Sequence, residues 1–168
     1  EMPRTDVTSD EVLSFTGEEA FAAPTPREPI PKNSYLVQIE SKPSVTRAGK
    51  PTVDLNLTVI EDKEGGTYKN RHIFDSIYLL GADEEKTMNL QRRVQLFYEA
   101  ATGEKLTGDA SASEVSVALS RSLNGKRIVV DVEVEEAVND DDGNTLRNAK
   151  NRVAYRGAHS AETWVPSF

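Results

Sequence analysis

The spacing of apolar residues changes twice along this chain, and that change constrains the fold more than any other feature. Apolar and polar residues alternate over 35–39, 53–59 and 128–134, which is typical of strands with one buried face. Between these segments, apolar residues from Met88 to Ala101 recur three or four positions apart, which indicates an amphipathic helix. The chain therefore predicts strands on both sides of a helical insert.

Turn residues set the bounds of the expected elements. Gly65-Gly66 marks a turn between the second and third strands, and 139–144 is the charged tip of a later hairpin. The strands are expected over residues 33–40, 53–60, 68–80, 127–134 and 148–156. Gly103 ends the first helix, and a weaker second helix covers about 113–123.

Five strands with a helix between the third and the fourth is the order of an OB-fold, a five-stranded, partly open Greek-key barrel. Other small barrels share the strand count, and the position of the helix favours the OB-fold over a sandwich. We therefore expect a mainly β fold: a five-stranded OB-type β-barrel with a helical insert between strands 3 and 4. On the first helix, Phe97 and Tyr98 are expected in the core, and Arg92 and Arg93 on the solvated face.

The chain divides into an arm, a body and a tail. Residues 1–29 are acidic, have little periodicity and end in a proline-rich stretch, so we expect a flexible acidic N-terminal arm. Residues 30–157 form the expected barrel domain, and residues 158–168 a short C-terminal tail. No segment is apolar enough to cross a bilayer and none resembles a signal peptide, so we expect a soluble, cytoplasmic protein.

The net charge of −8 is unevenly distributed. Residues 1–29 hold seven acids and two bases, and residues 131–142 hold seven acids and no base. The rest of the chain has 14 acids and 18 bases, a net of +4. The body is therefore moderately basic, which is compatible with a nucleic-acid partner.

Signals for catalysis are missing from the sequence. The chain has no cysteine, and its two histidines, His72 and His159, have no neighbours at metal-ligand spacing. The run 140–144 (DDDGN) resembles a calcium loop only loosely and is better explained as a hairpin turn. We expect no enzyme activity, no metal and no cofactor.

The third strand carries candidate binding residues on its outer face. If Ile73 and Ile77 point into the core, then His72, Phe74 and Tyr78 point outward. Nucleic-acid bases stack on such rings for about 1 to 3 kcal/mol each, whatever the base. The alternative is that a bulge shifts the strand and places Phe74 in the core.

Basic residues cluster in three places that could contact phosphates. The last strand has bases at alternate positions, which would share one face, and the first inter-strand loop of an OB-fold borders its binding groove. The candidates are Lys42, Arg47 and Lys50 in that loop, Lys69 and Arg71 at the entrance to the third strand, and Lys150, Arg152 and Arg156 on the last.

Four segments also resemble a known family: 30–39 (IPKNSYLVQI), 46–51 (TRAGKP), 68–75 (YKNRHIFD) and 123–126 (LNGK). They resemble phage-encoded OB-fold proteins of the single-stranded DNA-binding type, over about residues 30–157. Two family glycines are replaced by Asn33 and Asn70, and asparagine tolerates a positive φ. The resemblance implies sequence-independent binding of single-stranded DNA during phage replication or recombination, in the cytoplasm of a bacterial host.

Three interpretations remain open for partners. The end 166–168 (PSF) is similar to the Pro-Phe tip of bacterial single-strand-binding proteins, which would recruit replication or recombination proteins. The acidic arm and hairpin could instead mimic DNA in the binding groove. An unpaired edge strand could form a homodimer. The rival to DNA binding is a structural or protein-interaction module of a phage assembly, which need not show salt-sensitive DNA binding.

Overall fold

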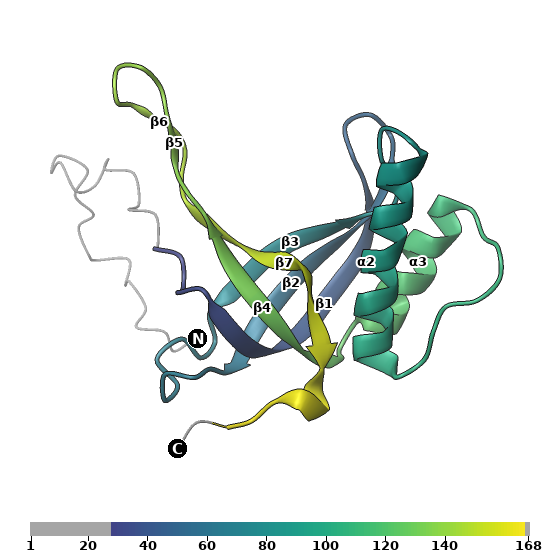
Figure 1. The fold of residues 1–168 in the computed structure, drawn as a ribbon, viewed down its shortest axis with the longest axis horizontal. Coiled ribbons are helices and arrows are strands. Elements are labelled where there is room, and N and C mark those ends of the chain that lie inside the picture. Colours follow the sequence, from purple (N-terminus) through teal and green to yellow (C-terminus); the bar gives the residue numbers. More distant parts are fainter. Residues whose placement is uncertain (1–27, 167–168) are drawn as a thin grey trace, which may run out of the picture.

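The computed structural model describes residues 28–166, and the expected arm and the last two residues lie outside that range apart from 28 and 29. Its centre is a curved, five-stranded antiparallel sheet with the order β3-β2-β1-β4-β7 (Figure 1). The long strands are β1 (Asn33–Val45), β2 (Pro51–Glu61), β3 (His72–Tyr78), β4 (Arg127–Glu135) and β7 (Lys150–Ser160). The hairpin β5 (Val138–Asn139) and β6 (Thr145–Arg147) extends from the ends of β4 and β7, and a short turn of helix, η1 (Ala161–Thr163), follows.

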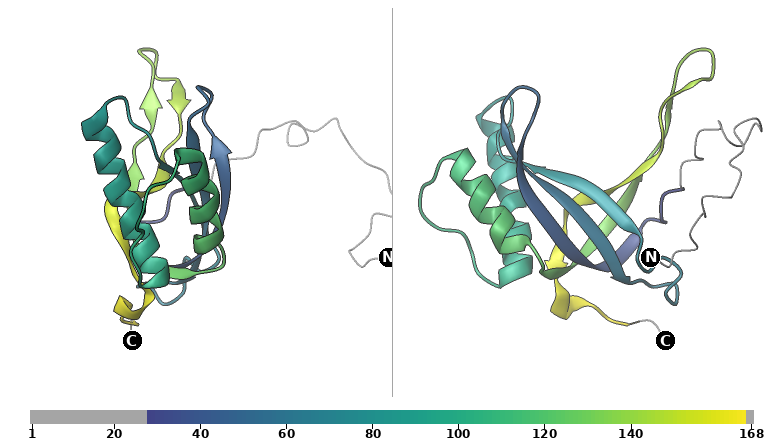
Figure 2. Two further views of the ribbon diagram at one scale, coloured as in Figure 1. Left: turned by 90° about the vertical axis from the view of Figure 1, so that its right-hand side faces the viewer. Right: turned by 180° about the vertical axis from the view of Figure 1, so that it is seen from behind.

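Two helices fill the connection between β3 and β4, where the sequence predicts a helical insert. Helix α2 (Glu84–Thr102) begins at Asp83, whose side chain accepts the Lys86 N–H, and ends at Gly103 with a φ of 78°. Helix α3 (Ala112–Leu123) begins with a capping box between Ser111 and Glu114. In Figures 1 and 2 the helices cover one end of the sheet, where α2 packs on β7 and α3 on β1 and β2.

The core lies between the concave face of the sheet and the helices. Alternate residues of β1, β2 and β4 are buried together with Ile73 and Ile77 of β3 and Phe97 of α2. Tyr35 is fully buried, and its hydroxyl donates a 2.6 Å hydrogen bond to the carbonyl of Pro31. Burial raises the pKa of this phenol to about 12. The alternation predicted from the sequence is confirmed for β2, whereas in β1 and β4 Leu36 and Val129 on the opposite face are buried as well.

The prediction of an OB-type barrel is wrong, because the sheet is not closed. A barrel requires its two edge strands to pair, yet within residues 28–166 no backbone ladder joins β3 to β7. Side chains connect the two edges instead: Asp75 Oδ2 accepts the Val153 N–H at 2.9 Å, and Arg93 donates to the carbonyls of Ser76 and Val153. The fold is a curved open sheet with two helices.

The connection between β2 and β3 is a ten-residue loop, 62–71, rather than the tight turn expected at Gly65-Gly66. Asp62 organises this loop, because its carboxylate accepts the N–H groups of Glu64, Gly66 and Tyr68 at 2.6 to 2.9 Å. Burial alone would raise the pKa of Asp62, but these hydrogen bonds lower it below its ordinary value. Asn70 has a φ of 69°, so one expected asparagine turn is confirmed.

A bulge interrupts β7 where the sequence predicts a regular strand. Val130 pairs with Ala158 and Val132 with Val153, so 154–157 oppose Asp131 alone. Gly157 lies close to Asp131 there, since a Cβ atom would fall 3.0 Å from the Asp131 carbonyl oxygen. Beyond the bulge, β7 continues to Ser160, past the predicted end at 156.

Two projections flank the outer surface of the sheet. In Figure 1 and from behind in Figure 2, the β5–β6 hairpin and the loop between β1 and β2 rise as the two arms of a V. The hairpin tip is the turn expected at 139–144, where Asp140 Oδ1 accepts the N–H groups of Asp142 and Asn144. Among residues 28–166, no helix combines the length and apolar character needed to cross a membrane.

Candidate nucleic-acid interface

The outer face of β3 presents two aromatic rings to solvent. Ile73 and Ile77 are buried in the core, and the strand is regular between them, so Phe74 and Tyr78 point outward with 67% and 49% of their surface exposed. The alternative that Phe74 belongs to the core is therefore excluded. Such exposure of large apolar side chains is costly unless a ligand or partner covers them.

His72 extends this face toward the loop 62–71. Its ring stacks on Phe74 with centroids 6.1 Å apart and an angle of 19° between the planes. Nδ1 of His72 lies 2.9 Å from Asn56 Oδ1 and 3.2 Å from Thr58 Oγ1, both on the neighbouring β2. These contacts hold the imidazole beside the Phe74 ring.

The two rings of β3 border the larger of two adjoining hollows. It has a volume of about 1070 Å³ and is lined by residues of β1, β2, β3, β4 and β7, including Phe74, Tyr78 and Lys150. A second hollow of about 450 Å³ shares Phe74, Lys150 and Asn151 with the first and continues to Arg71 and His72. Together these hollows form one groove, which we call the β3 groove.

Four of the expected basic residues line the β3 groove. Lys42 reaches it from β1, Arg71 from the loop 62–71, and Lys150 and Arg152 from β7. Arg152 is neutralised there, because it contacts Glu133 at 3.1 Å and Glu135 at 3.8 Å. Lys42, Arg71 and Lys150 form no ion pair within residues 28–166, so they are the groove's main source of positive charge.

The remaining expected cations lie away from the β3 groove. Arg47 and Lys50 are exposed in the β1–β2 loop, which the 2.8 Å hydrogen bond from the Thr46 N–H to the Lys50 carbonyl closes. Lys69 is exposed in the loop 62–71 and lines neither hollow. Arg156 lies in the β7 bulge, which interrupts the regular alternation from Lys150 and Arg152, and it lines neither hollow.

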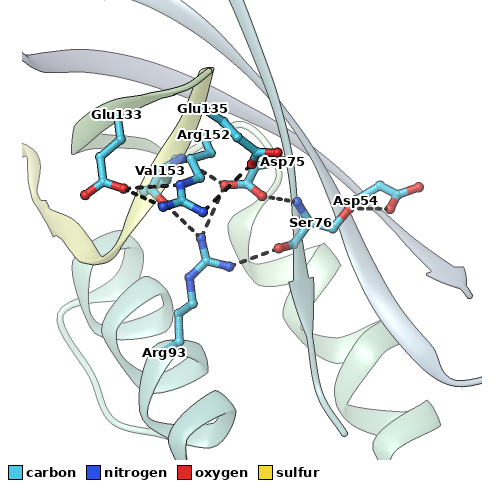
Figure 3. Close-up of polar contacts among 8 residues, drawn as sticks. All are labelled: Asp54, Asp75, Ser76, Arg93, Glu133, Glu135, Arg152 and Val153. Atoms are coloured by element: carbon cyan, nitrogen blue, oxygen red, sulfur yellow. Dashed lines mark hydrogen bonds and ion pairs between the residues drawn. The ribbon is translucent and has the colours of Figure 1, made fainter. Parts of the chain in front are cut away.

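An ion pair behind the groove was not expected from the sequence. Arg93 of α2 is only 7% exposed, not solvated as the helical spacing suggested. Its guanidinium contacts Asp75 Oδ2 at 3.3 Å, beside the Glu133–Arg152 pair drawn in Figure 3. Asp75 follows the outward Phe74 and therefore points inward, which is the one sequence signal that marks it as a buried acid in need of a partner.

Acidic side chains also line the groove and limit its positive character. Five acids line its two hollows, and Asp54 accepts a 3.1 Å hydrogen bond from the Ser76 hydroxyl. They are Glu28, Glu40, Asp54, Asp75 and Glu135. No group of three or more histidine or acidic residues within 28–166 could hold a metal ion. The arrangement can accept flat rings and a few negative charges.

Comparison with known proteins gives one family. Residues 20–157 match the model of DUF669, described as a protein of unknown function. A comparison with curated proteins gives no match.

Proposed function

We propose that this chain, which belongs to the DUF669 family of unknown function, binds single-stranded DNA without sequence preference in the β3 groove. The protein acts in phage DNA replication or recombination, in the cytoplasm of a bacterial host, as a binding protein rather than an enzyme. The main observation behind this proposal is that two exposed rings of β3, Phe74 and Tyr78, line the larger hollow.

Exposed aromatic rings on a β-strand can stack with unpaired bases. Residues 74 and 78 are four positions apart, about 13 Å along a strand, so each ring can take a separate base. Stacking is worth about 1 to 3 kcal/mol per base and is sequence-tolerant because every base has a flat face. In a duplex the bases are already stacked on each other, so the same rings cannot reach them.

The few cations of the groove can contact the phosphates of a single strand, which has a lower charge density than a duplex. Lys42 and Lys150 lie at the larger hollow, and Arg71 at the smaller. Three phosphate contacts would give a slope of about −2 in a plot of log affinity against log salt concentration for a single strand. The acids Glu40 and Asp54 keep this electrostatic share modest, so stacking must supply much of the affinity.

The test is fluorescence anisotropy of a labelled oligo-dT with the full chain, at 50 mM and 300 mM salt, with duplex DNA as competitor. The proposal predicts salt-sensitive binding that duplex DNA does not displace at equal concentration. If neither strand form binds at 50 mM salt, the proposal is wrong, and the rival role as a protein-interaction module of a phage assembly takes its place.

A second part of the proposal concerns replication or recombination partners at the C-terminus. The tail contacts the loop 62–71, since Lys63 Nζ lies 4.0 Å from the centre of the Trp164 ring and also donates to the carbonyl of Val165. The tip 167–168 lies outside the described residues. We propose that replication or recombination partners bind this tail.

A further inference from the structure

The N-terminal arm leaves the body of the protein inside the β3 groove. Glu28 and Pro29 line the smaller hollow together with Arg71, His72 and Phe74. The first residues that the structure describes therefore lie at the proposed DNA site.

The root of the arm is held firmly in that place. Arg71 Nη2 donates a 2.5 Å hydrogen bond to the carbonyl of Glu28. Ile30 is 1% exposed, and Asn151 binds both its N–H and its carbonyl, at 2.9 and 2.8 Å. Because Arg71 and Asn151 also line the groove, the groove itself fixes the point from which the arm extends.

The arm carries the chemistry that the groove accepts. Residues 1–27 contain six acids and two bases, and two phenylalanines, Phe15 and Phe21. An extended segment covers roughly 3.3 Å per residue, so Phe21 can reach about 23 Å from Glu28. Negative charges and flat rings on one backbone are also the features of single-stranded DNA.

From this coincidence of place, charge and rings, we propose that residues 1–27 of the same chain bind along the β3 groove and compete with single-stranded DNA. The inference rests on the proposed function for its competitor. A tethered segment has an effective concentration of about 1 mM. A segment that occupies the groove about 80% of the time would weaken DNA binding about fivefold.

A first experiment measures the contact without DNA. The chain has no cysteine, so Ser9→Cys in the full chain gives a single site for a nitroxide label. We expect the label to broaden the amide resonances of Phe74, Tyr78 and Lys150, and oligo-dT to restore them. Broadening that is absent, or that appears only when the label is on a second copy of the chain, would overturn the proposal.

A charge variant supplies the matched comparison. Neutralising four arm acids (Asp10→Asn, Glu11→Gln, Glu18→Gln, Glu19→Gln) should abolish the broadening and tighten oligo-dT binding about fivefold. The control neutralises four exposed acids of α2 and the α2–α3 loop that line neither hollow of the groove (Glu85→Gln, Glu99→Gln, Glu104→Gln, Asp109→Asn). Equal tightening in both variants would mean that only net charge matters, and the proposal would be wrong.

The two hypotheses fail in different ways. If oligo-dT binds both variants equally and the label has no effect on the groove, the arm proposal fails and the proposed function stands. If oligo-dT binds neither variant, the proposed function fails, and groove broadening that the arm charges control would still support occupancy of the groove by the arm.

Discussion

The guanidinium of Arg93 and the carboxylate of Asp75 lie 3.3 Å apart across the seam between β3 and β7. The same carboxylate accepts the backbone N–H of Val153, and the same guanidinium donates to the carbonyl of Val153. One ion pair thus takes the place of the backbone ladder that would close a barrel. It fixes the relative position of the strands that line the β3 groove.

Replacing Arg93 with methionine should destabilise the fold by about 1 to 3 kcal/mol, because Asp75, whose side chain is 18% exposed, would lose its charged partner. Urea unfolding followed by Trp164 fluorescence measures this change in the free energy of unfolding. The control is Arg92→Met on the exposed side of α2, which should cost less than about 0.5 kcal/mol. A loss below 1 kcal/mol for Arg93→Met would show that the pair does not hold the seam.

Asp62 should make stability depend on acid pH. Its folded pKa lies below the ordinary 3.8, so its contribution to stability is present above pH 3.8 and is lost as the pH falls through the folded pKa. Asp62→Asn should therefore cost about 2 to 3 kcal/mol at pH 7, and the difference from the unmodified protein should shrink at pH 3 and below. The neighbouring Glu61→Gln is the control, and a pH-independent difference for Asp62→Asn would contradict the account.

Lys150 should contribute to the salt dependence of DNA binding, because it lines both hollows of the β3 groove. Lys150→Gln removes one phosphate contact and should make the slope of log affinity against log salt concentration shallower by about 0.7. Lys105→Gln, an exposed lysine that lines neither hollow, is the matched control. An unchanged slope for Lys150→Gln would place the phosphates elsewhere.

Much of the fold could be predicted from the sequence, because burial follows a local period. The alternation in β1, β2 and β4 identifies most of the core residues that the structure buries. The three-to-four spacing in α2 identifies Val94 and Phe97, although Met88 on the same stripe is 52% exposed. The outward direction of Phe74 and Tyr78 follows from the same period. These features depend only on residues that are close together in the sequence.

Most of the errors concern contacts between distant residues. Sheet closure depends on whether β3 and β7 pair, and the inward Asp75 with Arg93 occupies the seam instead. The β7 bulge depends on the close approach of Gly157 to Asp131, so nothing in the spacing of Lys150 and Arg156 reveals it. Periodicity specifies which face a residue is on, whereas closure and bulges depend on tertiary packing.

The central claim is that single-stranded DNA stacks on the outer face of β3. The most direct measurement is oligo-dT anisotropy with Phe74→Ala and Tyr78→Ala, with Tyr155→Ala as the control, since Tyr155 is also an exposed aromatic residue and lines neither hollow. The account predicts that each β3 variant folds normally and binds about 5- to 150-fold more weakly, the equivalent of 1 to 3 kcal/mol per stacked base, while Tyr155→Ala binds as before. Unchanged affinity in both β3 variants would contradict it.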